Sequence, residues 1–116
     1  MLTITNLAAN IARDTDFLGK MDPYCIVYVG AQQQRTQVLQ DRGRNPRWND
    51  TLVFNAPPHE QIRVRIYDHD TGVDDFIGEA VIPVSQAAQQ RVVNVPFYSN
   101  NNSGTVSFMA QYGGSG

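Results

Sequence analysis

Short runs of β-type residues recur along the whole chain, separated by segments rich in turn residues. In the clearest run, Ile62, Val64 and Ile66 alternate with polar or aromatic side chains, which is the period of a strand with one buried face. No long stretch has the period of a helix. The predicted strands cover residues 2–7, 24–29, 34–39, 51–54, 61–67, 77–82, 91–95 and 104–112. This pattern predicts an all-β fold, an eight-stranded antiparallel β-sandwich.

One short helix is expected beside these strands, after Pro83, where Ser85 could cap residues 86–90. A chain of 116 residues suffices for one two-layer core, so we place a single domain at residues 1–112. The closing residues 113–116 read GGSG, and we expect them to be a flexible glycine-rich tail or a cloning remnant.

Charge and cysteine content exclude several classes of function. The net charge of −2 is too small for a nucleic-acid partner, which normally requires a basic face. A single cysteine cannot form an internal disulfide, so the fold needs no oxidising compartment. The first residues lack the basic opening and apolar stretch of a secretion signal, and no segment approaches the ~20 apolar residues of a membrane span. We therefore expect a cytoplasmic protein, and we take it to be a monomer.

Two segments, RDTDFLGKMDPY (13–24) and YDHDTGVDDFIGE (67–79), hold seven aspartates and one glutamate, eight of the eleven acidic residues in the chain. Each lies between two predicted strands, so both could meet at one end of the sandwich. Two carboxylates ~4 Å apart repel by about 4 kcal/mol at an effective dielectric near 20, which calls for a compensating cation. Calcium takes 6–8 oxygen ligands in irregular geometry, whereas zinc would recruit Cys or His, of which the chain has one and two. The alternative is two solvated turns, because aspartate favours turns for local hydrogen bonding.

Three motifs together carry a family resemblance: DFLGKMDPY at 16–24, NPRWND at 45–50 and DHD followed by DDFIGE within 68–79. They resemble the signatures of the C2 domain, the calcium- and phospholipid-binding β-sandwich, in the family's order and at nearly its spacing. The resemblance covers essentially the whole chain and is closest to small single-domain members from plants and protists. The chain starts on the strand before the first acidic loop and ends on GTVSFMAQY, an order that resembles the permuted topology with the extra strand last.

The resemblance implies a set of Ca²⁺ ligands in the two acidic loops. The set comprises the side chains of Asp16, Asp22, Asp68, Asp70 and Asp75 and the backbone carbonyls of Thr15 and His69. The segment from Asp68 to Asp75 is one residue shorter than the common family pattern. Asp74 could therefore replace Asp75 as the last ligand or share that role.

The loop tips carry side chains suited to a membrane surface. Phe17 and Leu18 lie at the tip of the first acidic segment, and Val73 lies in the other, which corresponds to the third loop of the family. These side chains could insert among lipid headgroups, where full burial is worth ~1.5–3 kcal/mol each. Phe17 could instead fold back onto its own loop. Arg42 and Arg44, in the second loop, could contact lipid phosphate or neutralise the aspartates.

The function implied is calcium-dependent binding to anionic phospholipid membranes, as a peripheral adaptor or sensor recruited from the cytoplasm. The alternative is a calcium-regulated protein–protein interaction module. We expect no catalysis, because no nucleophile motif and no phosphate-binding glycine loop is present. Trp48 and Cys25 are read as core residues rather than as functional ones.

Overall fold

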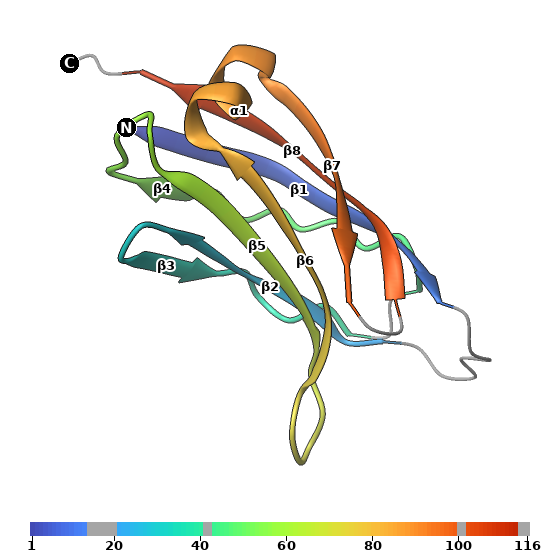
Figure 1. Cartoon of the computed structure of the whole chain (residues 1–116). Helices are drawn as coiled ribbons and strands as arrows, with labels where there is room; N and C mark the ends of the chain where they lie inside the picture. Colours follow the sequence, from blue (N-terminus) through green and yellow to red (C-terminus); the bar gives the residue numbers. More distant parts are fainter. Residues whose placement is uncertain (14–20, 41–42, 100–101, 114–116) are drawn as a thin grey trace.

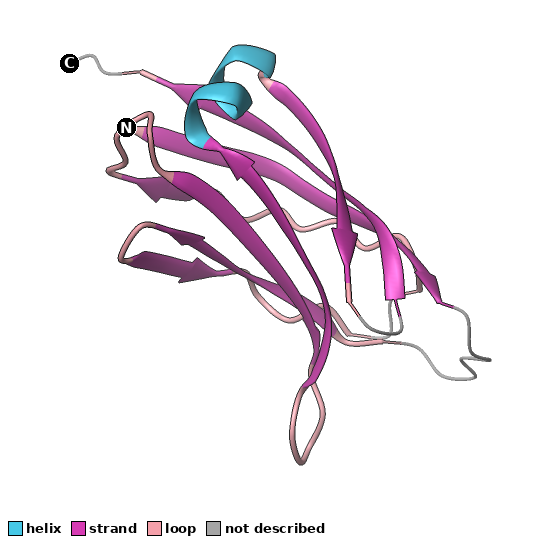
Figure 2. Cartoon of the chain, in the orientation of Figure 1, coloured by secondary structure: helices cyan, strands magenta, loops and turns pink. Residues whose placement is uncertain are grey.

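The computed structural model describes the chain except for residues 14–20, 41–42, 100–101 and 114–116. Within the described residues the chain forms eight strands and one short helix (Figures 1 and 2). In chain order these are β1 (Leu2–Arg13), β2 (Pro23–Val29), β3 (Gln32–Arg35), β4 (Leu52–Phe54), β5 (Gln61–Asp68), β6 (Asp75–Pro83), α1 (Val84–Gln90), β7 (Val92–Tyr98) and β8 (Asn102–Tyr112). In this described part, no helix is long and apolar enough to cross a membrane.

The strands are arranged as two antiparallel layers. Their order is β3-β2-β5-β6-β7-β8-β1-β4, with every neighbouring pair antiparallel. Among the described residues, one residue pair, Glu79 and Tyr98, joins β6 to β7, so the sheet turns a corner there (Figure 1). The predicted all-β, eight-stranded antiparallel sandwich is confirmed. The last strand, β8, lies between β7 and β1, while the permuted family topology stays a prediction.

The core lies between the two layers and follows the predicted alternation. Ile62, Val64 and Ile66 of β5 are all buried. Trp48 and Cys25 are buried as expected, and the indole Nε1 of Trp48 donates a hydrogen bond to the carbonyl of Pro23 at 3.2 Å. Burial of these apolar side chains supplies the main stabilisation of the sandwich.

The first strand is longer than predicted, because a β-bulge changes the phase of its alternation. Its register with β8 shifts between Thr5 and Ala8, and Asn6 adopts a positive φ of 54°. Asparagine tolerates this backbone region, and a bulge reverses which side chains face the core. The buried residues of β1 are accordingly Leu2, Ile4, Leu7, Ala9 and Ile11. The prediction that this strand ends at residue 7 was wrong.

The third strand was also misplaced, since residues 34–39 were expected and Gln32–Arg35 are observed. The ladder with β2 ends at Thr36, whose hydroxyl oxygen accepts the hydrogen bond of the Cys25 N–H at 2.9 Å. The exposed glutamine side chains of β3 instead bridge to β4. Gln32 exchanges two hydrogen bonds with the backbone of Asn55, at 2.7 and 3.1 Å. Side chains thus link the two outermost strands of the sheet, which are otherwise exposed edges.

The helix lies at the predicted place but begins two residues earlier, at Val84, and is not capped by Ser85. No side chain makes a cap hydrogen bond to the helix. Its first amides are satisfied by backbone carbonyls of the turn that precedes β5. The Val84 N–H donates to the Glu60 carbonyl at 2.9 Å, and the Ser85 N–H donates to the Pro58 carbonyl at 3.1 Å. Packing against this turn therefore replaces a side-chain cap.

Candidate metal centre

The predicted third loop connects β5 to β6 at the end of the sandwich where β2 begins (Figure 1). Pro23 of β2 lies opposite Asp68 of β5, and Asp68 lies opposite Asp75 of β6. Adjacent antiparallel strands bring these positions together at one sheet end. The aspartates on both sides of this connection, and Asp22 just before β2, therefore share one region.

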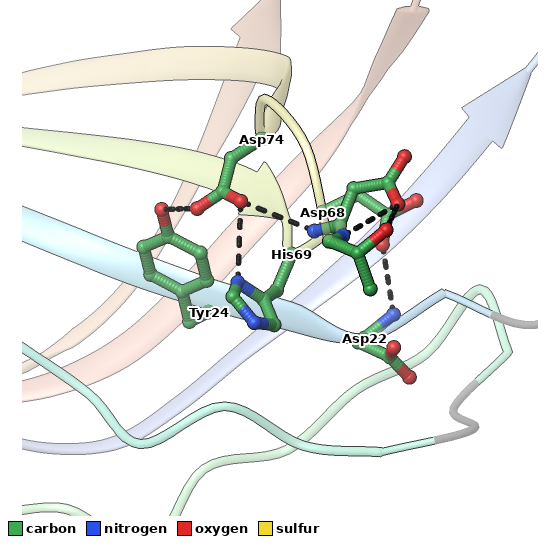
Figure 3. A network of polar contacts seen from close by, with 7 residues as sticks. Asp22, Tyr24, Asp68, His69 and Asp74 are labelled. Atoms are coloured by element: carbon green, nitrogen blue, oxygen red, sulfur yellow. Dashed lines mark hydrogen bonds and ion pairs between the residues drawn. The ribbon is translucent and has the colours of Figure 1, made fainter.

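Backbone hydrogen bonds join the two acidic segments directly. The Asp22 N–H donates to the Asp68 carboxylate Oδ1 at 2.9 Å (Figure 3). The Asp22 carbonyl accepts from the His69 N–H, also at 2.9 Å. The structure thus places the end of the first predicted loop against the start of the third. Thr15 and Asp16, two of the predicted ligands, lie outside the described residues.

The side chain of Asp74 contacts three other residues in this region (Figure 3). The Tyr24 hydroxyl donates to its Oδ2. Its Oδ1 accepts the Asp70 N–H at 3.1 Å and lies 3.2 Å from Nδ1 of His69. The Tyr24 hydrogen bond lowers the pKa of Asp74 below its ordinary value. Burial, followed by the Asp74 contact, raises the pKa of Tyr24 to about 12.

Asp70 and Asp75 differ from Asp74 in their surroundings. Asp70 lies beyond the end of β5, and its Oδ1 accepts the Thr71 N–H at 2.7 Å. The side-chain alternation of a strand therefore does not extend to Asp70. Asp75 is the first residue of β6 and is exposed. Both carboxylates lie at the surface of the connection.

The donor chemistry of this region fits calcium rather than zinc. The acidic side chains near the β5–β6 connection offer oxygen ligands, and the buried Cys25 thiol has a pKa raised well above its ordinary value by desolvation. Hard cations such as Ca²⁺ take oxygen donors, whereas zinc sites use thiolate or imidazole. Among the described residues, no three Asp, Glu, His or Cys side chains are grouped closely enough to hold a metal ion. A complete shell would have to draw on the segment 14–20 as well.

Of the predicted membrane-contacting residues, Val73 and Arg44 are described. The Val73 side chain is 85% exposed at the β5–β6 connection, as its predicted role requires. Arg44 is also exposed, while its backbone carbonyl accepts the Ile11 N–H at 2.8 Å. Phe17, Leu18 and Arg42 lie outside the described residues. Phe76, the second residue of β6, is 44% exposed and was not singled out from the sequence.

A pair of aromatic side chains in β2 and β5 packs beside the acidic residues and was not predicted. Tyr24 and Tyr67 lie opposite each other in β2 and β5, and their rings stack with centroids 5.4 Å apart. The Arg35 guanidinium lies 4.5 Å from the centroid of the Tyr24 ring. The stacking could have been predicted from the sequence only if the register between β2 and β5, which pairs the two tyrosines, had been known.

Comparisons with known proteins agree with this fold. The sequence model of one family, the C2 domain, matches residues 1–98. The 16 kDa phloem protein 1 of Arabidopsis thaliana is 36% identical over 99 residues, which are 79% of this chain and 64% of that protein. Human extended synaptotagmin-3 is 35% identical over 99 residues, which are 81% of this chain and 11% of that protein. The chain spans 50% to 64% of the length of the small plant relatives that it matches.

A solved structure shows the same architecture. The C2 domain-containing protein from a putative elicitor-responsive gene superposes with a TM-score of 0.80 at 27% identity, over 99% of this chain and 89% of that one. The superposition includes β8, which lies beyond the family match at residue 98 and completes the sheet between β7 and β1.

Proposed function

Since this chain belongs to the C2 domain family, whose members are generally binding modules rather than catalysts, we propose that it binds anionic phospholipid membranes in a calcium-dependent manner. It would act as a peripheral adaptor or sensor, recruited from the cytoplasm as a monomer. The observation that carries the proposal is a pair of hydrogen bonds at Asp22: its N–H donates to the Asp68 carboxylate, and its carbonyl accepts from the His69 N–H. They hold two separately encoded acidic segments at one end of the sandwich.

The described side chains of Asp22, Asp68, Asp70 and Asp75 would hold the cation, with Asp16 and the carbonyls of Thr15 and His69 completing the shell. In the absence of a cation, this end of the domain carries a concentration of negative charge that an anionic membrane repels. Bound Ca²⁺ would supply compensating charge and open coordination positions suited to phosphate oxygens. The protein's own contribution is to hold its carboxylates together at one edge.

Apolar contact would add to this electrostatic term. The exposed Val73 is suited to enter the headgroup region, together with Phe17 and Leu18 of the first loop. Full burial of such a side chain is worth ~1.5–3 kcal/mol, so a few of them give weak, reversible binding. The exposed Arg44 would contact lipid phosphate, and the same role is proposed for Arg42.

Sedimentation with liposomes across a calcium series tests this function. Vesicles of phosphatidylserine and phosphatidylcholine should retain the protein with calcium and release it with chelator. Glu60→Gln, which removes one negative charge from the turn before β5, should bind like the unaltered protein, whereas Asp75→Asn should not respond to calcium. Equal sedimentation with calcium and with chelator would refute the proposal. If no vesicle binding occurs but a protein is retained only with calcium, the protein–protein alternative is favoured instead.

A further inference from the structure

The contacts of Asp74 point to a role that differs from that of the other aspartates. We propose that Tyr24 is a positioning residue: its hydroxyl holds the Asp74 carboxylate and so fixes the 69–74 turn, and Asp74 is not itself a cation ligand. We call the Tyr24–Asp74 hydrogen bond the latch. Its consequence for cation affinity rests on the calcium binding proposed above.

Both oxygens of the Asp74 carboxylate are engaged (Figure 3). The Tyr24 hydroxyl donates to Oδ2, while Oδ1 accepts the Asp70 N–H at 3.1 Å and contacts the His69 ring at 3.2 Å. Hydrogen bonds to a charged acceptor are stronger than those between neutral groups and orient it firmly. Asp74, at the end of the turn, is therefore bonded to residues 69 and 70 at its start, and Tyr24 links the closed turn to β2.

Tyr24 is well fixed for this task. Its side chain is 5% exposed and stacks on Tyr67 with the two ring planes 18° apart. Arg35 lies over the ring at 4.5 Å, and the N–H of the next residue, Cys25, is bonded to the Thr36 hydroxyl at 2.9 Å. Because the ring cannot swing, its hydroxyl offers Asp74 an anchor whose position is set by the sheet. An anchor that is ordered in advance lowers the entropic cost of ordering the turn on binding.

The same contacts make Asp74 a poor ligand compared with Asp75. To coordinate a cation, Asp74 would have to give up the Tyr24 hydroxyl, leaving a phenol on a buried residue without its partner, which costs free energy. Asp75 is exposed, lies opposite Asp68, and among the described residues no hydrogen bond to its carboxylate is formed. The last ligand of the third loop is therefore Asp75, and the shortened loop is held by Asp74.

Calorimetric calcium titration of four variants tests the latch. Tyr24→Phe removes the hydroxyl alone and should weaken calcium binding about tenfold, because the turn then has to be ordered when the cation binds. Asp74→Asn should weaken binding to a similar extent, and the double variant should be no weaker than either, since both changes break one contact. Tyr67→Phe, the matched control, removes a hydroxyl from the stacked neighbour and should change affinity less than twofold. Asp75→Asn should abolish binding.

Two results in this titration would overturn the proposal. If Asp74→Asn abolished binding as Asp75→Asn does, Asp74 would be a ligand. If Tyr24→Phe bound calcium equally well or more tightly, the hydroxyl would not position the site but would be neutral or compete for Asp74.

A second measurement needs no calcium and separates the latch from the proposed function. The Asp70 N–H donates to Asp74, so its solvent exchange, measured by NMR in chelator, reports whether the turn is closed. Exchange should be about tenfold faster in Tyr24→Phe than in the unaltered protein or in Tyr67→Phe. Unchanged exchange would overturn the latch whatever the calcium result. Absence of calcium binding to the unaltered protein, with faster exchange in Tyr24→Phe, would refute the proposed function and leave the latch established.

Discussion

Replacing Asp68 and Asp70 together by asparagine should remove calcium binding without unfolding the domain. Each carboxylate accepts a backbone hydrogen bond on its Oδ1: Asp68 from the Asp22 N–H at 2.9 Å and Asp70 from the Thr71 N–H at 2.7 Å. Asparagine keeps one acceptor oxygen at nearly the same place. Both local bonds can therefore persist while two negative charges are lost.

The expected magnitude follows from mass action. A cation that binds only the folded protein at a concentration of 100 times its dissociation constant stabilises it by about 2.7 kcal/mol. For a domain of this size, 1 kcal/mol corresponds to about 4 °C in melting temperature, so calcium should raise the melting temperature of the unaltered protein by roughly 10 °C. Asp68→Asn/Asp70→Asn should show no such shift. In chelator the double variant should melt at the same temperature or slightly higher, because repulsion between like charges is relieved.

Thermal scans of both proteins, with chelator and with millimolar calcium, provide the measurement. Glu60→Gln serves as the control, since it removes an acidic charge away from the β5–β6 connection and should retain the full calcium shift. If the double variant kept the calcium-induced shift, Asp68 and Asp70 would not be ligands. If the variant lost the shift but melted far lower in chelator, the two side chains would be structural, and the reasoning from retained hydrogen bonds would be refuted.

Three further predictions concern the fold. A Cβ at Gly78 would lie 2.1 Å from the Phe97 ring, so Gly78→Ala should lower the free energy of unfolding in urea by about 1–3 kcal/mol. Gly43→Ala should be neutral, because apart from its chain neighbours no atom of the described residues lies within 4 Å of a Cβ there. Cys25 is fully buried with a raised thiol pKa, so a thiol reagent should modify it only on unfolding, and rapid labelling of the native protein would contradict this. The pKa of Tyr24 is raised from 10.0 to about 12, so its neutral form is favoured by folding; its contribution is complete below pH 10 and is lost as the pH rises towards 12. Unfolding in chelator between pH 9 and 12 should therefore be steeper in pH for the unaltered protein than for Tyr24→Phe.

The sandwich could be predicted because its strands are specified locally. Alternation at Ile62, Val64 and Ile66 marks a half-buried strand without reference to any other part of the chain. The same alternation predicts an end of β1 at residue 7 rather than at Arg13, because its phase shifts by one position at the bulge around Asn6. A period of two detects a strand only up to the point where its phase changes.

The start of α1 shows a second limit of local reading. A serine near a predicted helix start favours a side-chain cap, and Ser85 was placed accordingly. The first amides are instead paired with carbonyls of Pro58 and Glu60, which lie about 25 residues earlier in the chain. Such backbone partners carry no side-chain signal, so only the packing of α1 against the turn before β5 reveals them.

The candidate site was predictable in its location but not in its internal contacts. Loops at the same end of neighbouring antiparallel strands can lie side by side, and the Asp22–Asp68 hydrogen bond agrees with that expectation. The Tyr24–Asp74 contact joins residues 50 positions apart. It depends on the β2–β5 register and on the shape of the 69–74 turn, neither of which residue spacing encodes.

Residues 22–24 explain physically why three separated motifs occur in one chain. The carbonyl of Pro23 accepts the indole N–H of Trp48 from the NPRWND motif, while Asp22 bonds to the start of the β5–β6 connection. Tyr24 then holds Asp74 at the end of the same connection. The second and third motifs therefore both contact this short segment, which belongs to the first motif and lies at the start of β2. A substitution in any of the three motifs should consequently shift the positions of the same carboxylates, even when the altered residue is buried and distant from them.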